Sequence, residues 1–282
     1  MRGWWQDLTD LVLPAECAGC GAARAVLCGR CRAALGGRAP GRVRPVPEPA
    51  GLPVTHAAVP YAEEVRSVLL AHKERGVLAL AGALGTALAG SVRAHSSQLP
   101  GPGPAVRGPV VLVPVPSARR AVRARGHDPV RRIALAAAGE LRRTGTPARV
   151  AAVLRQRRAV ADQSGLDARR RLANVTGALE VAAGGARLLG AGPVVLVDDL
   201  MTTGATLAEA ARAVRCETAG ARGAAYGAVC REGRGERRIG GRPECEKWMH
   251  GAPKRDAVNA PVPFLRAAVI AAPRDSFEIN RN

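Results

Sequence analysis

The stretch VVLVDDLMTTGATL, residues 194–207, constrains the fold most strongly. Its apolar start predicts a buried strand, two adjacent carboxylates follow, and a loop of small and hydroxyl side chains leads into an apolar pattern with helical spacing. Such a loop offers backbone N–H groups, hydroxyls and a helix N-terminus to one anion, and a phosphate fits that description. Because adjacent carboxylates suit sugar hydroxyls or a hydrated Mg²⁺, the stretch predicts a phosphorylated sugar ligand.

Predicted strands and helices alternate along much of the remaining chain. Apolar runs predict strands over residues 54–61, 109–115, 149–154, 177–181 and 194–197. Helical spacing or capping predicts helices over residues 63–72, 76–94, 128–143 and 207–214. This alternation predicts an α/β fold, a mostly parallel sheet flanked by helices, with a small amino-terminal zinc knuckle. One more strand is expected after the last helix, with residues 223–229 and 265–273 as the two candidates.

Composition divides the chain into five predicted parts. Residues 1–35 form a cysteine element, 36–53 a linker rich in Gly, Pro and Arg, and 54–229 the α/β domain. Residues 230–264 have no periodicity and predict an irregular, disordered insertion. Residues 265–282 are then a candidate terminal strand with its tail. Since ligands bind beyond the carboxyl ends of parallel strands, the 198–206 loop and a basic loop over 117–126 are expected at one edge.

The amino-terminal element has the pattern C-x2-C-x7-C-x2-C. Its ligand candidates are Cys17, Cys20, Cys28 and Cys31. Two C-x-x-C turns can aim four thiolates at one ion, which predicts a closed, structural Zn²⁺ site. Unmetallated thiols are the alternative, while a redox pair is disfavoured because no βαβ pattern surrounds it. Glycines expected to give the positive φ of a tight knuckle are Gly19, Gly21 and Gly29. Nearby cations that favour thiolates are Arg24, Arg30 and Arg32.

The charge of the chain is strongly positive, at +19 with a pI of about 11.3. Such a field attracts nucleic acid, phosphorylated metabolites or anionic membranes, although arginine-rich codon usage alone is an alternative explanation. With 2% aromatic residues, the chain lacks the aromatic interleaving that stacks single-stranded bases. We expect no transmembrane segment and no signal peptide, and therefore a reducing, cytoplasmic location in which cysteines bind metal rather than form disulfides.

At this level of detail the chain resembles a known family. Residues 194–207 resemble the 5-phosphoribosyl-1-pyrophosphate signature of type I phosphoribosyltransferases. The features that narrow the resemblance to the ComF family (competence protein F-like) are the double zinc-ribbon or four-cysteine element, VPVP at 113–116, R-x-R-G at 123–126, and Gln163 with R-x-x-N at 171–174. The resemblance covers roughly residues 12–229 together with the last residues, RDSFEINRN. The chain departs from the family at His127–Asp128, where an aromatic residue followed by Asn is more usual.

The resemblance implies a pentosyltransferase that binds phosphoribosyl pyrophosphate with Mg²⁺ and releases pyrophosphate. Asp198 and Asp199 match the acids that contact the ribose hydroxyls. The positions that match the 5′-phosphate loop are Thr202, Thr203, Gly204, Ala205 and Thr206. Basic side chains expected at the pyrophosphate are Arg119, Arg120, Arg125 and Lys73, for which a solvated basic face is the alternative. The pattern does not indicate the acceptor.

Two functions stay open on this basis. The first is a phosphoribosyltransferase acting on an unidentified acceptor. The second is a non-catalytic competence protein that serves DNA uptake by binding single-stranded DNA or partner competence proteins. The intact loop over residues 198–206 favours retained donor binding, and the positive charge fits both.

Overall fold

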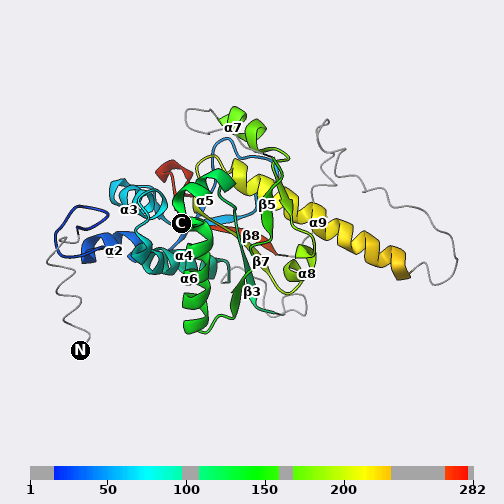
Figure 1. Cartoon of the computed structure of the whole chain (residues 1–282), viewed down its shortest axis with the longest axis horizontal. Helices are drawn as coiled ribbons and strands as arrows, with labels where there is room; N and C mark the ends of the chain where they lie inside the picture. Colours follow the sequence, from blue (N-terminus) through cyan, green and yellow to red (C-terminus); the bar gives the residue numbers. More distant parts are fainter. Residues whose placement is uncertain (1–15, 97–107, 159–167, 230–263, 279–282) are drawn as a thin grey trace.

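A six-stranded sheet of order β1-β2-β8-β7-β3-β4 forms the centre of the computed structural model, which describes residues 16–96, 108–158, 168–229 and 264–278 (Figure 1). Its strands are β1 (Gly41–Val43), β2 (Thr55–Pro60), β3 (Val110–Pro114), β4 (Ala148–Val150), β7 (Val194–Leu200) and β8 (Leu265–Ala272). Strand β1 pairs antiparallel with β2, and every other neighbouring pair is parallel. The expected α/β fold with a mostly parallel sheet is therefore confirmed.

Helices cover both faces of this sheet (Figure 1). They are α2 (Gly29–Gly36), α3 (Glu63–Lys73), α4 (Ala81–Ser96), α5 (Arg119–Arg125), α6 (Pro129–Arg143), α7 (Ala168–Val175), α8 (Gly185–Leu189) and α9 (Ala205–Val229). Buried side chains of α3, α4 and α6 form one apolar cluster, and those of α8 and α9 form the other. Both clusters consist almost entirely of Ala, Val, Leu and Ile, as the shortage of aromatic residues requires. In the described part of the chain, no helix is long and apolar enough to cross a membrane.

The last strand of the sequence lies in the middle of the sheet. Strand β8 pairs with β2 on one side and with β7 on the other. Of the two candidates for this strand, residues 265–272 are therefore the correct one, and residues 223–229 belong to α9. The alanine-rich sequence GAAYGAV continues a helix readily, whereas LRAAVIAA places β-branched residues where both faces are covered. The insertion predicted for 230–264 falls almost wholly outside the described residues.

The segment predicted as one strand over 149–154 is two strands in different sheets. Strand β4 ends at Val150, and β5 (Leu154–Gln156) pairs antiparallel with β6 (Leu179–Val181) in a separate two-stranded sheet. The chain turns between them, with the Val153 N–H donating to the Ala151 carbonyl at 2.9 Å. The small sheet packs against α9 and lies on the same side of the large sheet as that helix.

Two further segments are more ordered than their composition predicts. Within the expected linker over 36–53, β1 forms an edge strand whose Val43 is buried in the core. The expected basic loop over 117–126 contains α5, which ends at Gly126 with φ 74°. Six of the seven residues of α5 are Arg or Ala, which have good helix propensity, so this charged segment is a helix rather than the expected loop. At α6 the prediction is confirmed, because the Asp128 carboxylate accepts from the Arg131 N–H and Pro129 occupies the first turn.

Candidate functional site

The two predicted acids lie at the carboxyl end of β7. The strand continues to Leu200, so Asp198 and Asp199 are its fifth and sixth residues instead of following it. The four residues before them are fully buried, as expected for a strand covered on both faces. Strand β3 ends alongside, because Val115 N–H donates to the Val197 carbonyl at 2.9 Å. Both strands therefore end at the carboxyl edge of the sheet, which is where ligands bind in parallel α/β folds.

Lys73 and Asp199 form an ion pair at this edge. The Lys73 Nζ atom lies 3.1 Å from Asp199 Oδ2, and the two side chains are 36% and 8% exposed. Lys73 is the last residue of α3, so the end of this helix places the Lys73 ammonium group beside the end of β7. The charge of Asp199 raises the pKa of Lys73, with a smaller contribution of the same sign from Asp198. The ammonium group therefore stays protonated and compensates a carboxylate that has lost most of its water.

Asp198 has a strongly perturbed carboxyl group. Asp198 is half-buried, and this burial raises the pKa of its carboxyl well above the ordinary value. The negative charge of Asp199 raises it further, while Lys73 and the N–H of Asp199, which donates to Asp198 Oδ1 at 2.9 Å, act in the opposite direction. Two crowded acids with one lysine favour a ligand that brings hydroxyl donors or a cation.

The predicted phosphate loop connects these acids to α9. Gly204 has φ 73°, a left-handed conformation that a side chain would strain, and α9 begins directly after it at Ala205. Thr202 is exposed, whereas Thr203 and Thr206 are half-buried. The first N–H groups of α9 have no preceding turn to which they can donate, and the helix dipole adds positive potential there. The loop thus has the donors and field of an anion site.

The predicted basic residues occupy different positions around this edge. Arg125 at the end of α5 forms a two-pronged pair with Glu74, its Nε and Nη2 atoms lying 3.0 and 2.7 Å from the carboxylate oxygens. Glu74 directly follows Lys73, so this pair joins α5 to the end of α3. Arg119 and Arg120 lie exposed on the first turn of α5 and make no ion pair within the described residues. Lys73 therefore contacts Asp199 directly, whereas Arg125 is held near this edge by its pair with Glu74, the residue that follows Lys73.

Sequence reasoning missed Glu74, and it missed Pro45 and Leu52, which pack against Gly204 of the loop. Glu74 gave one signal, its position beside Lys73 in the run KERG. Of the residues that carried the resemblance, Gln163 lies outside the described part, and residues 171–174 lie in α7. His127 bonds locally through Nδ1, 3.1 Å from the Arg125 carbonyl, and its Nε2 is buried with no partner within the described residues.

The four predicted cysteines converge in the amino-terminal knuckle. The four sulfur atoms lie within 4.8 Å of one another, and those of Cys20 and Cys28 are 3.6 Å apart. A tetrahedral Zn²⁺ with Zn–S bonds of about 2.3 Å requires sulfur atoms about 3.8 Å apart, so the cluster fits such an ion. Cys17 and Cys31 are buried, and none of the four forms a disulfide. Four cysteines leave no open coordination position, which suits a structural metal.

Backbone geometry explains only part of the glycine pattern in the knuckle. Gly21 has the expected positive φ of 75°. Gly19 and Gly29 do not have a positive φ, which corrects the prediction, and Gly19 is needed because an added Cβ would lie 2.7 Å from Cys31 Sγ. Gly29 instead opens α2. Arg24 itself takes the left-handed conformation, with φ 67°.

Burial and polar neighbours shift the pKa values of the cysteine thiols in opposite directions. Burial raises the pKa of Cys17, but N–H groups including that of Cys28, whose nitrogen is 3.3 Å from Cys17 Sγ, bring it to about 6. Arg30 hydrogen-bonds Cys20, which raises the pKa of the guanidinium. Burial raises the pKa of Cys31 instead. Metal binding would deprotonate all four thiols.

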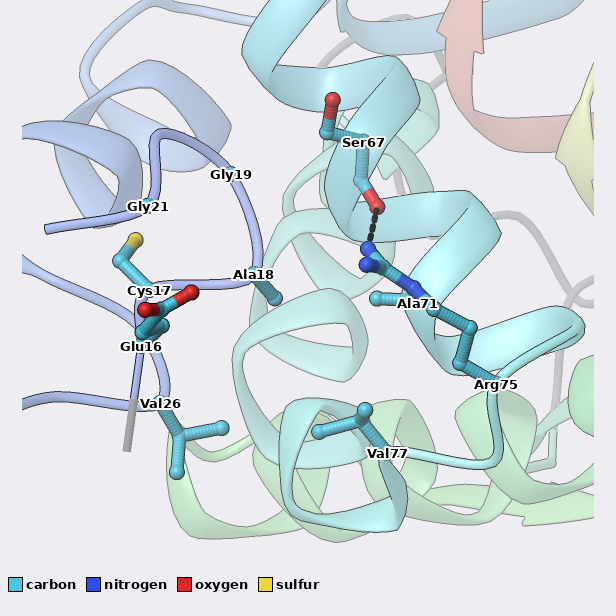
Figure 2. Close-up of a pocket in the computed structure, with 10 residues that line it drawn as sticks. All are labelled: Glu16, Cys17, Ala18, Gly19, Gly21, Val26, Ser67, Ala71, Arg75 and Val77. Atoms are coloured by element: carbon cyan, nitrogen blue, oxygen red, sulfur yellow. Dashed lines mark hydrogen bonds between the residues drawn. The ribbon is translucent and has the colours of Figure 1, made fainter. Parts of the chain in front are cut away.

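A hollow of about 400 Å³ lies between part of the knuckle and α3 (Figure 2). Cys17, Ala18 and Val26 line one side, and Ala71 and Val77 line the other. Arg75 closes part of it by donating from Nη2 to the Ser67 carbonyl at 3.4 Å. None of the predicted donor-binding residues lines this hollow, so it is separate from the site at the end of β7.

Comparison with known proteins adds no relative. No protein-family model matches the chain, and no curated protein matches its sequence. The case for function therefore rests on the chemistry of the two clusters, the acidic strand end with its loop and the four-cysteine knuckle.

Proposed function

We propose that the protein binds 5-phosphoribosyl-1-pyrophosphate with Mg²⁺ at the end of β7 and transfers the phosphoribosyl group to an acceptor. The observation that carries the proposal is the continuous unit of strand, two acids, left-handed glycine and helix start over residues 194–207. The resemblance to the ComF family and to type I phosphoribosyltransferases supports the same assignment. The donor places a phosphate, two hydroxyls and a pyrophosphate on one small ring, which is the set of groups that this edge can meet.

Each part of the site has a role in this proposal. The N–H groups at the start of α9 and the hydroxyls of Thr203 and Thr206 bind the 5′-phosphate. Asp198 and Asp199 accept from the ribose hydroxyls, so the donor supplies the hydrogen-bond donors that the crowded acids lack. An Mg²⁺ ion that arrives with the donor would lie near Asp198 and Asp199 and would supply neutralisation of the charge on the leaving group. Bound ribose then replaces Lys73 as the partner of Asp199, and the ammonium turns to the pyrophosphate.

The proposed reaction requires little proton transfer by the protein. The bond between the anomeric carbon and the pyrophosphate oxygen breaks, and its electron pair leaves with pyrophosphate. A bond from the acceptor nucleophile to the same carbon forms, and the acceptor loses its proton to solvent. Basic groups stabilise the charge that develops on the leaving oxygen, for which Arg119, Arg120 and Lys73 are available. This accounts for a site made of acids, backbone donors and cations.

The four-cysteine knuckle has a structural role in this proposal. The four cysteines would hold Zn²⁺, which would stabilise the knuckle, and α2 of the knuckle contributes Leu35 to the apolar cluster formed with α3 and α4. The metal contributes no step of the reaction. Free cysteines of this kind are expected in a reducing compartment, and we therefore propose that the protein acts in the cytoplasm.

A second candidate function is binding of single-stranded DNA, as proposed for a competence protein. The observation that favours it is the net charge of +19 together with the exposed arginines of α5. Phosphate contacts would make the affinity fall steeply with salt. A fluorescence titration with single-stranded oligonucleotide at rising salt tests this function. A steep slope supports it, and no binding at low salt excludes it.

Isothermal titration with the donor and Mg²⁺ tests the first function. We expect wild-type protein to bind the donor and the variant Asp198→Asn/Asp199→Asn to lose at least about tenfold in affinity, as for removed charge-assisted hydrogen bonds. Asp275→Asn is the matched control, because it removes an exposed carboxylate from the 3-10 turn Arg274–Ser276. Equal binding by wild type and the double variant would exclude the assignment of these acids.

A further inference from the structure

Residues 44–52, here called the strap, link β1 to β2 and run past the phosphate loop. One end is fixed where the Arg44 N–H donates to the Ser276 carbonyl at 2.7 Å. The Arg44 side chain also binds Glu48, with Nε–Oε2 and Nη2–Oε2 distances of 2.9 and 2.6 Å. At the other end the Gly51 carbonyl accepts from Arg215 Nη1 at 2.8 Å. Since Arg215 belongs to α9, the strap is fastened to the helix that begins at the phosphate loop.

The strap packs directly on the left-handed glycine of that loop. A Cβ built on Gly204 would lie 3.0 and 3.2 Å from the two terminal carbons of Leu52 and 3.3 Å from Pro45 Cγ. Leu52 is half-buried and also packs against the apolar cluster that contains Met201 and Leu207. The apolar contact therefore covers one side of Gly204, while the neighbouring Thr202 and Thr203 keep access to solvent.

We propose that Leu52 is a positioning residue for the donor's 5′-phosphate, an inference that rests on the proposed function. Glycine is the residue that fits at position 204, but glycine alone leaves the backbone free to leave φ 73°. Packing by Leu52 and Pro45 restricts this freedom without competing for the loop's N–H groups. The donors at the start of α9 are then held in one direction before the ligand arrives, which lowers the entropic cost of binding.

The strap packs on Gly204 of the phosphate loop, whereas Lys73 pairs with Asp199 from the end of α3, so strap variants test the 5′-phosphate separately from the pyrophosphate. The probes are ribose 5-phosphate, magnesium pyrophosphate and phosphoribosyl pyrophosphate, each titrated calorimetrically into the full chain. We expect Leu52→Ala to weaken binding of the two ligands that carry a 5′-phosphate by about tenfold, because the loop loses preorganisation. Affinity for magnesium pyrophosphate should stay unchanged. Val46→Ala is the matched control, since Val46 is 93% exposed on the same strap.

A second variant protects the test against simple unfolding. Arg215→Met removes the hydrogen bond to the Gly51 carbonyl while leaving Leu52 in place. It should weaken binding of the same two ligands that carry a 5′-phosphate and leave binding of magnesium pyrophosphate unchanged. If wild type binds the donor and both variants bind it equally well, the inference is overturned and the proposed function stands. Equal loss for all three probes in variants with a native thermal transition overturns it as well, because that pattern indicates general damage. If wild type binds none of the probes, the proposed function and this inference fail together.

Discussion

Lowering the pH from 7 to 5 should destabilise the protein through a buried pair of histidines. His56 in β2 and His95 in α4 are 2% and 4% exposed, with their Nδ1 atoms 3.1 Å apart. His95 Nε2 lies 2.8 Å from the Ala267 carbonyl. Because a carbonyl only accepts, this nitrogen carries the proton, and His95 Nδ1 then accepts from His56 Nδ1–H. In this arrangement of neutral rings, His95 can take another proton only if the contact with His56 breaks or His56 changes to its other tautomer.

The size of the effect follows from the shifted pKa. Burial, reinforced by His56, lowers the pKa of His95 from 6.5 to about 3. Between these values the unfolded chain binds a proton that the folded chain does not, so stability is lost as the pH falls below about 6.5. The full shift corresponds to about 5 kcal/mol, of which about 2 kcal/mol is lost by pH 5. The pKa of His56 is lowered by burial too, so its contribution has the same sign.

Urea denaturation of wild type and His95→Gln at both pH values measures this loss. The glutamine amide can still donate to the Ala267 carbonyl, but it does not titrate. Wild type should lose about 2 kcal/mol more of its unfolding free energy between pH 7 and pH 5 than the variant does. If the two proteins lose the same amount, the account of His95 as a neutral buried group is refuted.

Three other perturbations test the knuckle and the acidic strand end. Gly19→Ala should lower the unfolding free energy by about 1–3 kcal/mol and lower the zinc content, because the new methyl group collides with Cys31 Sγ. Gly29→Ala is the control, since its methyl group meets no neighbouring atom and should leave stability and zinc content unchanged. Equal melting temperatures and metal contents for the two variants would contradict this. Metal analysis should find one zinc per chain, and a chelator should lower the melting temperature; zinc-free protein with an unchanged transition would exclude the site. Lys73→Met should weaken donor binding. Because Lys73 lowers the pKa of Asp198, the variant should also begin to bind the donor only at a higher pH than wild type does. An unchanged pH profile of binding in calorimetry would argue against the pairing of Lys73 with the acids.

Local sequence predicted the parts of the site that local sequence builds. The apolar run before the acids and the Asp128–Pro129 helix start each follow from short-range rules, and each occurs as expected. The knuckle was predictable for the same reason, because metal-ligand spacing is a local property. The role of Gly19 was not, since its close contact with Cys31 depends on how the knuckle closes.

The remaining features depend on contacts between distant parts of the chain. The central position of β8 could not be predicted, because two apolar segments were equally suited and strand order has no local signal. Lys73 and Asp199 are 126 positions apart, so their pairing appears only when α3 and β7 are packed. The dense charge of residues 119–125 suggested a loop, although the same residues are good helix formers. The contact of the strap with the phosphate loop could not be predicted, because its Gly- and Pro-rich composition is typical of linkers.

Phosphorus NMR of the donor tests the central claim most directly. With Mg²⁺ present, adding wild-type protein to phosphoribosyl pyrophosphate should broaden or shift both the 5′-phosphate and the pyrophosphate resonances, because the loop and the basic residues contact different phosphorus atoms. The Asp198→Asn/Asp199→Asn variant should leave both resonances close to those of the free donor. Unperturbed resonances with wild type, or equal perturbation by the two proteins, would contradict the assignment of residues 198–206 as the donor site.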